Sequence, residues 1–311
     1  RSTSCRKWTS AAASEKPDME FKLKNDDLSV SLNTQGGTLA AITGSDGTEY
    51  LWDGNPAYWT GQAPVLFPIC GSIRNDKAEI GNSSRTQMPR HGIVRKREFK
   101  KEYVDHDTAQ FSIRSNNELF EQFPYPFTLY TTYQLGGKTI KITYSVRNDG
   151  KIDMPYFIGG HPGFNCPLFP GESYDDYYLK FEKTENCSVP RPITETGLID
   201  SEDRTAFLDG TDTLPLSHDL FKEDAVILDR LQSREVSLLS KNSGRGVKLS
   251  FEDFPYLILW STNNNGPFIA LEPWSGLSTC ENESDVFEEK QGVSIVKPGE
   301  TRSRSFEIEI I

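Results

Sequence analysis

The stretch Phe127–Val146 reads FTLYTTYQLGGKTIKITYSV and holds two runs rich in β-branched and aromatic residues, Phe127–Gln134 and Lys138–Val146. Gly136 and Gly137 stand between the two runs. A Gly-Gly pair supplies the positive φ angles that a tight hairpin turn needs. Apolar and polar residues alternate in the runs, as they do in a half-buried strand. The stretch therefore predicts an antiparallel β-hairpin.

The same alternation recurs along most of the chain, as at Leu28, Val30 and Leu32, which precede a turn at Gly36-Gly37. Further strands are predicted at Tyr177–Phe181, Ala225–Leu228, Val236–Leu239, Val247–Phe251, Tyr256–Trp260, Phe268–Leu271, Gly292–Ile295 and Arg302–Ile311. Short helical turns are predicted near Pro215–Phe221 and Glu283–Glu289. No long amphipathic helix and no internal repeat of about 20 to 50 residues is found. The pattern predicts an all-β fold, a large antiparallel sandwich of many strands.

Composition restricts the partners of the chain. Its 311 residues include 34 Lys and Arg against 45 Asp and Glu, for a formal net charge of -11. Phosphate groups would be repelled, so the charge argues against nucleic acid and anionic membrane surfaces. No apolar run approaches the roughly 20 residues of a membrane-spanning helix. We therefore expect neither nucleic acid nor membrane as a partner.

The cysteines indicate neither a zinc site nor a disulfide framework. They are odd in number and scattered, and no CxxC pair occurs; they are Cys5, Cys70, Cys166, Cys187 and Cys280. A chain of this length can bury a full core without cross-links. We expect mostly reduced, buried thiols in a cytoplasmic protein.

The first residues differ from the rest of the chain. Residues 1–18 read RSTSCRKWTSAAASEKPD and lack the apolar segment of a secretory signal. A strand-like pattern starts at Met19. We expect residues 1–18 to be a leader or cloning tail, with a transit peptide as the alternative, and residues 19–311 to form a single domain.

Three short segments contain the residues best suited to chemistry. His161 lies between Gly-Gly and Pro-Gly, on a sharply shaped loop where backbone can approach a ligand closely. His91 lies in the segment PRHGIVR. Glu272 follows an apolar run and precedes Pro273 and Trp274, and a carboxylate there is costly unless it is bonded or held for use. Trp274 offers a flat apolar face to the C–H groups of a sugar.

These segments resemble the aldose 1-epimerase (galactose mutarotase-like) family, and most closely its LacX-like branch. The resemblance covers about residues 19–311, and the matching segments follow the order of the family. They are LFPICGSIRND (Leu66–Asp76), PRHGIVR (Pro89–Arg95), GGHPGFNCPL (Gly159–Leu168), FKEDAVILD (Phe221–Asp229) and FIALEPWSG (Phe268–Gly276). The resemblance implies a β-supersandwich that holds a sugar in an open groove across one sheet.

The resemblance also implies roles for individual residues. Glu272 matches the general base that takes the proton from the C1 hydroxyl, and His161 matches the general acid that protonates the ring oxygen. His91 matches a histidine that hydrogen-bonds the ring oxygen and adjacent hydroxyls. Arg74 and Asp224 are candidates for the arginine and the aspartate that bind the sugar.

Parts of that match are loose. Ser72 competes with Arg74 for its position, and Glu223 and Asp219 lie near Asp224 in the sequence. The family often has Tyr or Ala after the His-Pro pair, where this chain has Gly163. We expect this glycine to enlarge the site. Trp52 and Trp59 could also line the groove, with core packing or simple exposure as the alternatives.

The chemistry suits these residue types independently of the resemblance. Exchange of the two anomers removes a proton from O1 and gives one to O5, after which the ring opens, C1–C2 rotates and the ring closes. A carboxylate and an imidazole can divide these tasks. No metal or organic cofactor is required. The sequence thus predicts an isomerase, an aldose 1-epimerase (mutarotase), with a small-molecule hexose such as galactose or glucose as substrate.

A basic segment leaves two alternatives open. Residues 73–101 contain nine Lys and Arg and three acids. A solvated surface hairpin is the preferred explanation of this surplus, and a phosphate site in a hexose-6-phosphate mutarotase is the alternative. A carbohydrate-binding protein without catalysis is the third possibility. We expect a monomer or a weak homodimer.

Overall fold

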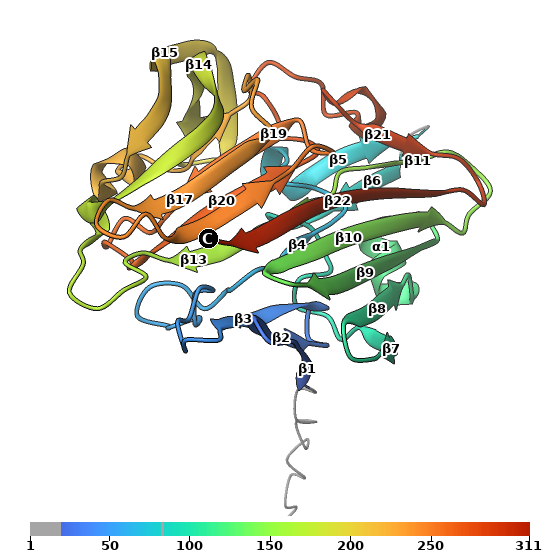
Figure 1. The fold of residues 1–311 in the computed structure, drawn as a ribbon. Helices are drawn as coiled ribbons and strands as arrows, with labels where there is room; N and C mark the ends of the chain where they lie inside the picture. The colour runs from blue at the N-terminus through green and yellow to red at the C-terminus, as the bar shows by residue number, and fades with distance from the viewer. Residues whose placement is uncertain (1–19, 82–83) are drawn as a thin grey trace, which may run out of the picture.

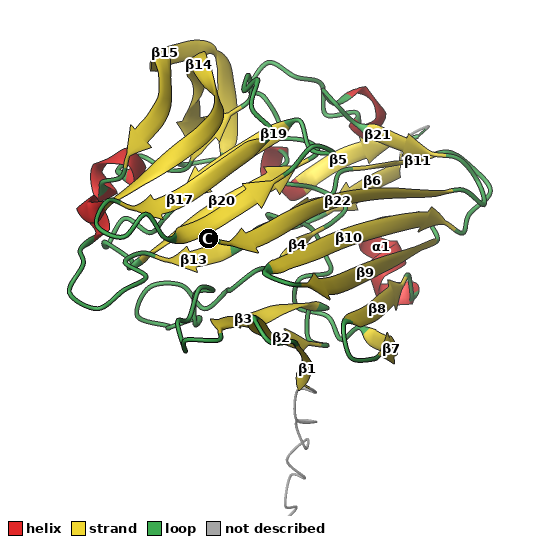
Figure 2. Ribbon diagram, in the orientation of Figure 1, coloured by secondary structure: helices red, strands yellow, loops and turns green. Residues whose placement is uncertain are grey.

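The computed structural model describes residues 20–81 and 84–311. The predicted leader or tail, residues 1–18, and Cys5 lie outside the described residues. Antiparallel strands are the main regular structure of the described chain, with very little helix, as Figure 2 shows, so the predicted all-β sandwich is confirmed. Its short helices are α1 (Asn117–Gln122) and 3₁₀ turns at Arg74–Asp76, Tyr174–Asp176, His218–Phe221 and Phe287–Glu289.

The largest sheet has nine strands and forms one layer of the molecule (Figure 1). In spatial order they are β15 (Leu198–Pro215), β14 (Tyr177–Ile193), β17 (Glu235–Ser240), β18 (Gly246–Ser250), β22 (Thr301–Ile310), β10 (Thr139–Asn148), β9 (Phe127–Gly136), β8 (Thr108–Arg114) and β7 (Lys100–Val104). The predicted hairpin is β9 and β10, with Gly137 at positive φ in its turn. Its alternating residues, such as Ile140 and Ile142, are fully buried.

The second sheet holds the site described below. It has six strands: β16 (Val226–Leu228), β19 (Tyr256–Trp260), β20 (Phe268–Trp274), β12 (Gly159–Gly160) and β4 (Val65–Leu66), with β13 (Gly163–Asn165) also pairing with β20. The two large sheets pack face to face. At Gly160 of β12, a Cβ atom would lie only 2.9 Å from the Phe306 ring of β22. A side chain there would push the sheets apart, so the glycine allows the close contact.

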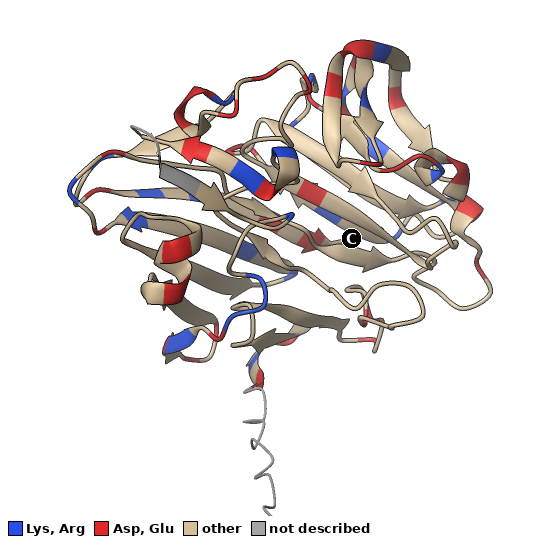
Figure 3. Cartoon of the chain, turned by 180° about the vertical axis from the view of Figure 1, so that it is seen from behind, with Lys and Arg blue, Asp and Glu red and all other residues tan. Residues whose placement is uncertain are grey.

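Smaller sheets complete the described part of the fold. A three-stranded sheet contains β1 (Glu20–Lys24), β2 (Leu28–Asn33) and β3 (Thr38–Gly44). Two-stranded pairs are formed by β5 (Lys77–Ile80) with β6 (Ser84–Gln87), and by β11 (Met154–Tyr156) with β21 (Ser294–Val296). Acidic and basic residues are interspersed along strands and loops (Figure 3). Within the described ranges, no helix has both the length and the apolar composition to cross a membrane.

Two strand predictions were wrong in extent. The strand predicted at Tyr177–Phe181 continues as β14 to Ile193, and its hairpin partner β15 was not predicted at all. The pairing of β14 with β15 has four register shifts, and β15 leaves most of its side chains at least partly exposed. Bulges of this kind interrupt the alternation on which sequence prediction depends. The strand predicted at Phe268–Leu271 continues through Glu272 to Trp274 and is buried along its whole length.

Candidate active site

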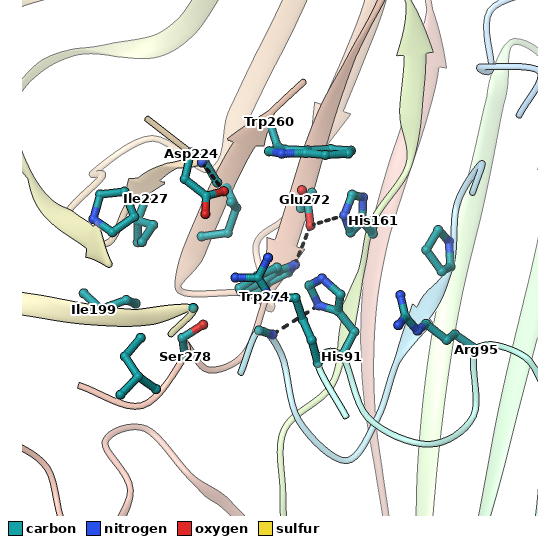
Figure 4. A pocket seen from close by; sticks show the side chains of 18 of the residues that line it. His91, Arg95, His161, Ile199, Asp224, Ile227, Trp260, Glu272, Trp274 and Ser278 are labelled. Atoms are coloured by element: carbon teal, nitrogen blue, oxygen red, sulfur yellow. Dashed lines mark hydrogen bonds and ion pairs between the residues drawn. The ribbon is translucent and has the colours of Figure 1, made fainter. Parts of the chain in front are cut away.

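A cavity of about 280 Å³ opens beside strand β20, close to the lower end of the range of about 300–1,000 Å³ for small-molecule sites. Figure 4 shows the side chains that line it. The structure brings five of the six predicted site residues to this cavity, namely His91, His161, Asp224, Glu272 and Trp274. They come from three loops and one strand, far apart in the sequence.

Glu272 lies near the end of β20 and is only 1 % exposed. Trp274 lies two residues further along, so both side chains point to the same face of the sheet. The Nε1–H of Trp274 donates a hydrogen bond of 3.1 Å to Oε2 of Glu272. The same oxygen lies 3.3 Å from Nε2 of His161 (Figure 4). Glu272 is thus a deeply buried carboxyl group with two nitrogen partners.

His161 occupies the turn between β12 and β13, both of which pair with β20. The backbone carbonyl of Pro162 accepts a hydrogen bond from the N–H of Leu271, which fixes the turn against the strand of Glu272. Aromatic rings surround the imidazole. Trp59 stacks on it with ring centroids 4.8 Å apart, and Trp260 meets it edge-on at 5.5 Å.

His91 lies on the loop after β6 and has a positive φ of 69°, which is uncommon for a residue other than glycine. Its Nδ1 accepts a hydrogen bond of 3.2 Å from the backbone N–H of Gly71. Because Nδ1 accepts, the neutral ring carries its hydrogen on Nε2, which remains available as a donor. The His91 and His161 rings meet edge-to-face at 5.4 Å.

Burial controls the protonation of these groups. It lowers the pKa of His161 to about 3, with smaller lowering effects from the positive charges of Arg95 and Arg90. Burial also holds the pKa of His91 well below its usual range. It raises the pKa of Glu272 well above its usual range, against the opposing effect of the Trp274 hydrogen bond. Burial therefore favours a protonated Glu272 facing a neutral His161, so the pair carries one movable proton and no net charge.

Arg90 and Arg95 also line the cavity, and both belong to the basic segment for which a phosphate site was one expectation. Nε of Arg90 donates a hydrogen bond of 2.9 Å to Oγ of Ser72. Burial and the neighbouring Arg90 lower the pKa of Arg95. Neither guanidinium forms an ion pair with a carboxylate in the described part of the chain. Both flank His91 in the PRHGIVR segment, which was the available signal for their position.

The prediction for Arg74 does not fit its position. Its guanidinium pairs with Asp285 at 3.0 Å and donates to the backbone carbonyls of Cys280, Glu281 and Glu283. It does not line the cavity. Arg74 is thus engaged in holding the loop after β20, and Arg90 and Arg95 are the arginines that neighbour the histidines. Sequence spacing could not separate these two, because Asp285 lies 211 positions from Arg74.

Other expectations had mixed outcomes. Asp224 lines the cavity, where its Oδ1 accepts a hydrogen bond from the N–H of Ala225. Trp59 also lines the cavity. Trp52 does not line the cavity and packs on Phe268, with ring centroids 4.7 Å apart. The expectation that Gly163 enlarges the site was wrong, because Trp59 fills the adjacent space.

Another wall of the cavity, next to Arg90, was not predicted from the sequence. It is apolar and includes Pro192, Leu198 and Ile199 from the β14–β15 hairpin, together with Ile227 of β16. The four described cysteines, Cys70, Cys166, Cys187 and Cys280, are free and buried as predicted.

Comparison with known proteins agrees with this architecture. The family model described as aldose 1-epimerase matches residues 19–309. Protein LacX (chromosomal) of Lactococcus lactis subsp. lactis is 49% identical over 298 residues, which cover 94% of this chain and 100% of that protein. The plasmid form of LacX from the same organism gives the same figures.

Solved structures with the same fold include two from lactobacilli. A galactose mutarotase related enzyme from Lactobacillus acidophilus superposes with a TM-score of 0.88 and 27% identity, covering 94% of this chain and 97% of that one. A galactose mutarotase-like protein from Lactobacillus casei gives a TM-score of 0.85 and 28% identity, covering 94% and 100%. These likenesses confirm the galactose mutarotase-like fold expected from the sequence.

The protonation of the buried pair predicts opposite pH effects for two variants. Unfolded histidine titrates near ~6.5, above the folded pKa of about 3, so His161 makes the fold about 2 kcal/mol less stable at pH 5 than at pH 7. Unfolded glutamate titrates near ~4.3, below the raised folded pKa, so Glu272 makes the fold less stable as pH rises from 5 to 7. We expect Glu272→Gln to raise the free energy of unfolding at pH 7 relative to that at pH 5. His161→Gln should do the opposite and raise it at pH 5 relative to pH 7. Urea unfolding at both pH values measures this.

His106→Gln is the matched control, because the His106 side chain is 86% exposed on a surface loop. Its pH dependence of stability should follow that of the unaltered chain. Shifts of the same sign in Glu272→Gln and His161→Gln would contradict the assigned protonation.

Proposed function

The chain belongs to the aldose 1-epimerase family, and we propose that it interconverts the α and β anomers of a hexose by general acid–base catalysis. The observation that carries the proposal is the 3.3 Å contact between the Glu272 carboxyl and the His161 imidazole at the side of a cavity. Galactose and glucose are the proposed substrates. The reaction is an isomerisation within one sugar molecule.

The spacing of the pair suits ring opening. The two oxygens that exchange protons, O1 and O5, are both bonded to C1, so the base and the acid must lie side by side. Glu272 removes the O1 proton while Nε2 of His161 protonates O5, and the C1–O5 bond breaks to give the open-chain aldehyde. Rotation about C1–C2 presents the other face of the carbonyl. Reversal of the proton transfers then closes the ring as the other anomer.

The proton count of the pair is constant through this cycle. With the cyclic sugar bound, the reactive form has a Glu272 carboxylate and a His161 imidazolium. After ring opening it has a carboxylic acid and a neutral imidazole, the form that burial favours. The buried site thus offsets part of the cost of the open-chain intermediate. Entry of the sugar hydroxyls supplies the polar contacts under which the proton passes from Glu272 to His161.

The remaining residues of the cavity bind the sugar. Nε2–H of His91 donates to the ring oxygen or an adjacent hydroxyl, and the Asp224 carboxylate accepts from a hydroxyl. Arg90 is the proposed binding arginine in place of Arg74, because it lies in the cavity. Trp274 serves twice, since its Nε1–H fixes Glu272 and its ring offers an apolar surface to the sugar.

Replacement of Glu272 by Gln tests the proposed base. Gln retains the size of the side chain and an oxygen that can accept the Trp274 hydrogen bond, but it cannot take a proton. We expect kcat for galactose or glucose to fall about 10²- to 10⁴-fold, while sugar affinity changes little. Polarimetry of freshly dissolved α-sugar gives the rate and calorimetry gives the affinity.

Glu121→Gln is the matched control, since Glu121 is an exposed residue of α1 outside the cavity. It should anomerise sugar at the unaltered rate. Near-normal turnover by Glu272→Gln would refute the role of this carboxylate. Sugar binding by the unaltered chain with no anomerisation above buffer would favour a carbohydrate-binding protein instead.

A hexose 6-phosphate is the second candidate substrate, and one observation favours it. Arg90 and Arg95 line the cavity without a carboxylate partner among the described residues. Two such guanidiniums suit a phosphate group, which accepts charge-assisted hydrogen bonds from them. Under this alternative the phosphate lies at the arginines, and the sugar ring reaches the Glu272–His161 pair.

Comparison of glucose with glucose 6-phosphate tests the second candidate. If the phosphate group is recognised, kcat/KM for glucose 6-phosphate should exceed kcat/KM for glucose at least about tenfold. Arg95→Gln should remove this difference. Arg97→Gln is the control, because Arg97 pairs with Glu118 instead of lining the cavity. Equal rates on both sugars would leave the unphosphorylated hexose as the substrate.

Three broader expectations are also proposals. A single family model matches residues 19–309, which supports one domain over residues 19–311. The free thiols of the described cysteines support a reducing compartment such as the cytoplasm. A monomer or weak homodimer is proposed for the assembly.

A further inference from the structure

Trp59 covers one face of the His161 ring. The two rings stack with centroids 4.8 Å apart and planes 29° apart. Trp59 comes from the loop between Trp52 and Gln62, whose outer residues are mostly exposed, and its own side chain is partly exposed. His161 beneath it is only 6 % exposed. A surface loop therefore shields the imidazole of the buried pair.

Aromatic contacts hold Trp59 in this position. Its ring stacks on Phe268 at 5.4 Å and meets Trp260 edge-on at 5.4 Å. The Nε1–H of Trp52 donates a hydrogen bond of 2.8 Å to the backbone carbonyl of Trp59. Phe268 lies on β20, the strand that also carries Glu272. The loop is thus tied to the same strand as the proposed base.

Gly163 provides the space for Trp59. Its carbonyl accepts a hydrogen bond from the N–H of Trp52, and its N–H donates to the carbonyl of Gln62, so it pairs with both ends of the loop. A Cβ atom at Gly163 would lie 2.9 Å from Cζ3 of Trp59 and 3.3 Å from Cβ of Trp52. A side chain at this position would displace the Trp59 ring from His161.

We propose that Trp59 is a positioning residue for His161 and that Gly163, by lacking a side chain, is the residue that admits it. The inference rests on the proposed function for its effect on rate, but the placement of Trp59 does not depend on that function. The indole blocks rotation of the imidazole away from Glu272 and keeps water from its exposed face. The proton of the pair is thereby confined to the short path between Nε2 of His161 and Glu272.

The charged or titratable groups that face His161 come from two parts of the described chain. Glu272 lies against it from β20, and His91, Arg90 and Arg95 approach from the loop after β6. Burial is the largest cause of its lowered pKa, and the Trp59 ring supplies part of that burial. Removal of the indole should therefore hydrate the imidazole and raise the pKa of His161.

The first experiment titrates the histidines by NMR in Trp59→Ala, Trp59→Phe and the unaltered chain. We expect Trp59→Ala to raise the pKa of His161 by at least about 1 and to lower kcat about tenfold or more, with the acidic limb of its pH–rate profile shifted. Trp59→Phe keeps a stacked ring and should retain most of both properties. His106, exposed on a surface loop, is the internal reference resonance.

The second experiment is a double-mutant cycle between Trp59→Ala and Gly163→Ala. Gly163→Ala alone should raise the pKa of His161 and lower kcat in the same directions, because the new methyl group displaces the indole. In the Trp59→Ala background the same change should have little further effect, since nothing remains to displace. Gly136→Ala is the control glycine, because a Cβ atom there meets nothing within 4 Å.

Either of two results would overturn the inference: an unchanged or lowered pKa of His161 in Trp59→Ala, or additive effects of the two substitutions. These results are distinguishable from failure of the proposed function. If the unaltered chain anomerises no sugar, the NMR titration still reports whether Trp59 and Gly163 set the state of His161. A raised pKa of His161 in Trp59→Ala, in a protein that anomerises no sugar, would support the inference while the missing activity refutes the mutarotase proposal.

Discussion

The burial of one carboxyl group, that of Glu272, in strand β20 is the constraint on which the site depends. Glu272 lies in β20, a strand buried along its whole length. The desolvation free energy of an isolated charge there would exceed the stabilisation from local packing. The structure meets this cost with the Nε1–H of Trp274 and with the imidazole of His161. Since burial favours the uncharged form of both titratable partners, one proton shared between them keeps the pair neutral.

The requirements of that pair extend into the fold around it. His161 reaches Glu272 only because β12 and β13 both pair with β20 and turn sharply between Gly160 and Gly163. Gly160 allows the nine-stranded sheet to approach from one side, and Gly163 allows the Trp59 loop to approach from the other. A side chain at either glycine would press on packed aromatic rings, which have little room to yield. Core packing and site geometry therefore depend on the same short segment.

The sequence predicted those parts of the molecule whose cause is local. The β9–β10 hairpin is encoded by alternation and a Gly-Gly turn, and His161 and Glu272 stand in unusual settings next to proline. Prediction from the sequence failed where a side chain's position depends on a partner far along the chain. Arg74 was chosen by its neighbours in sequence, but its partner Asp285 decides its direction, which leaves Arg90 for the cavity. The β14–β15 hairpin was largely missed because bulges break its alternation.

The electrostatic balance of the cavity follows from the same pair. A neutral Glu272–His161 pair leaves Arg90 and Arg95 as the cations of the cavity, and Asp224, which also lines it, forms no ion pair among the described residues. Polar groups with unused hydrogen-bonding capacity are stable at a cavity wall only while water or a ligand satisfies them. A polyhydroxylated molecule can satisfy both signs at once, since each hydroxyl both donates and accepts. The apolar wall from β14–β15 then orients that molecule, because only a C–H face can pack there without losing hydrogen bonds.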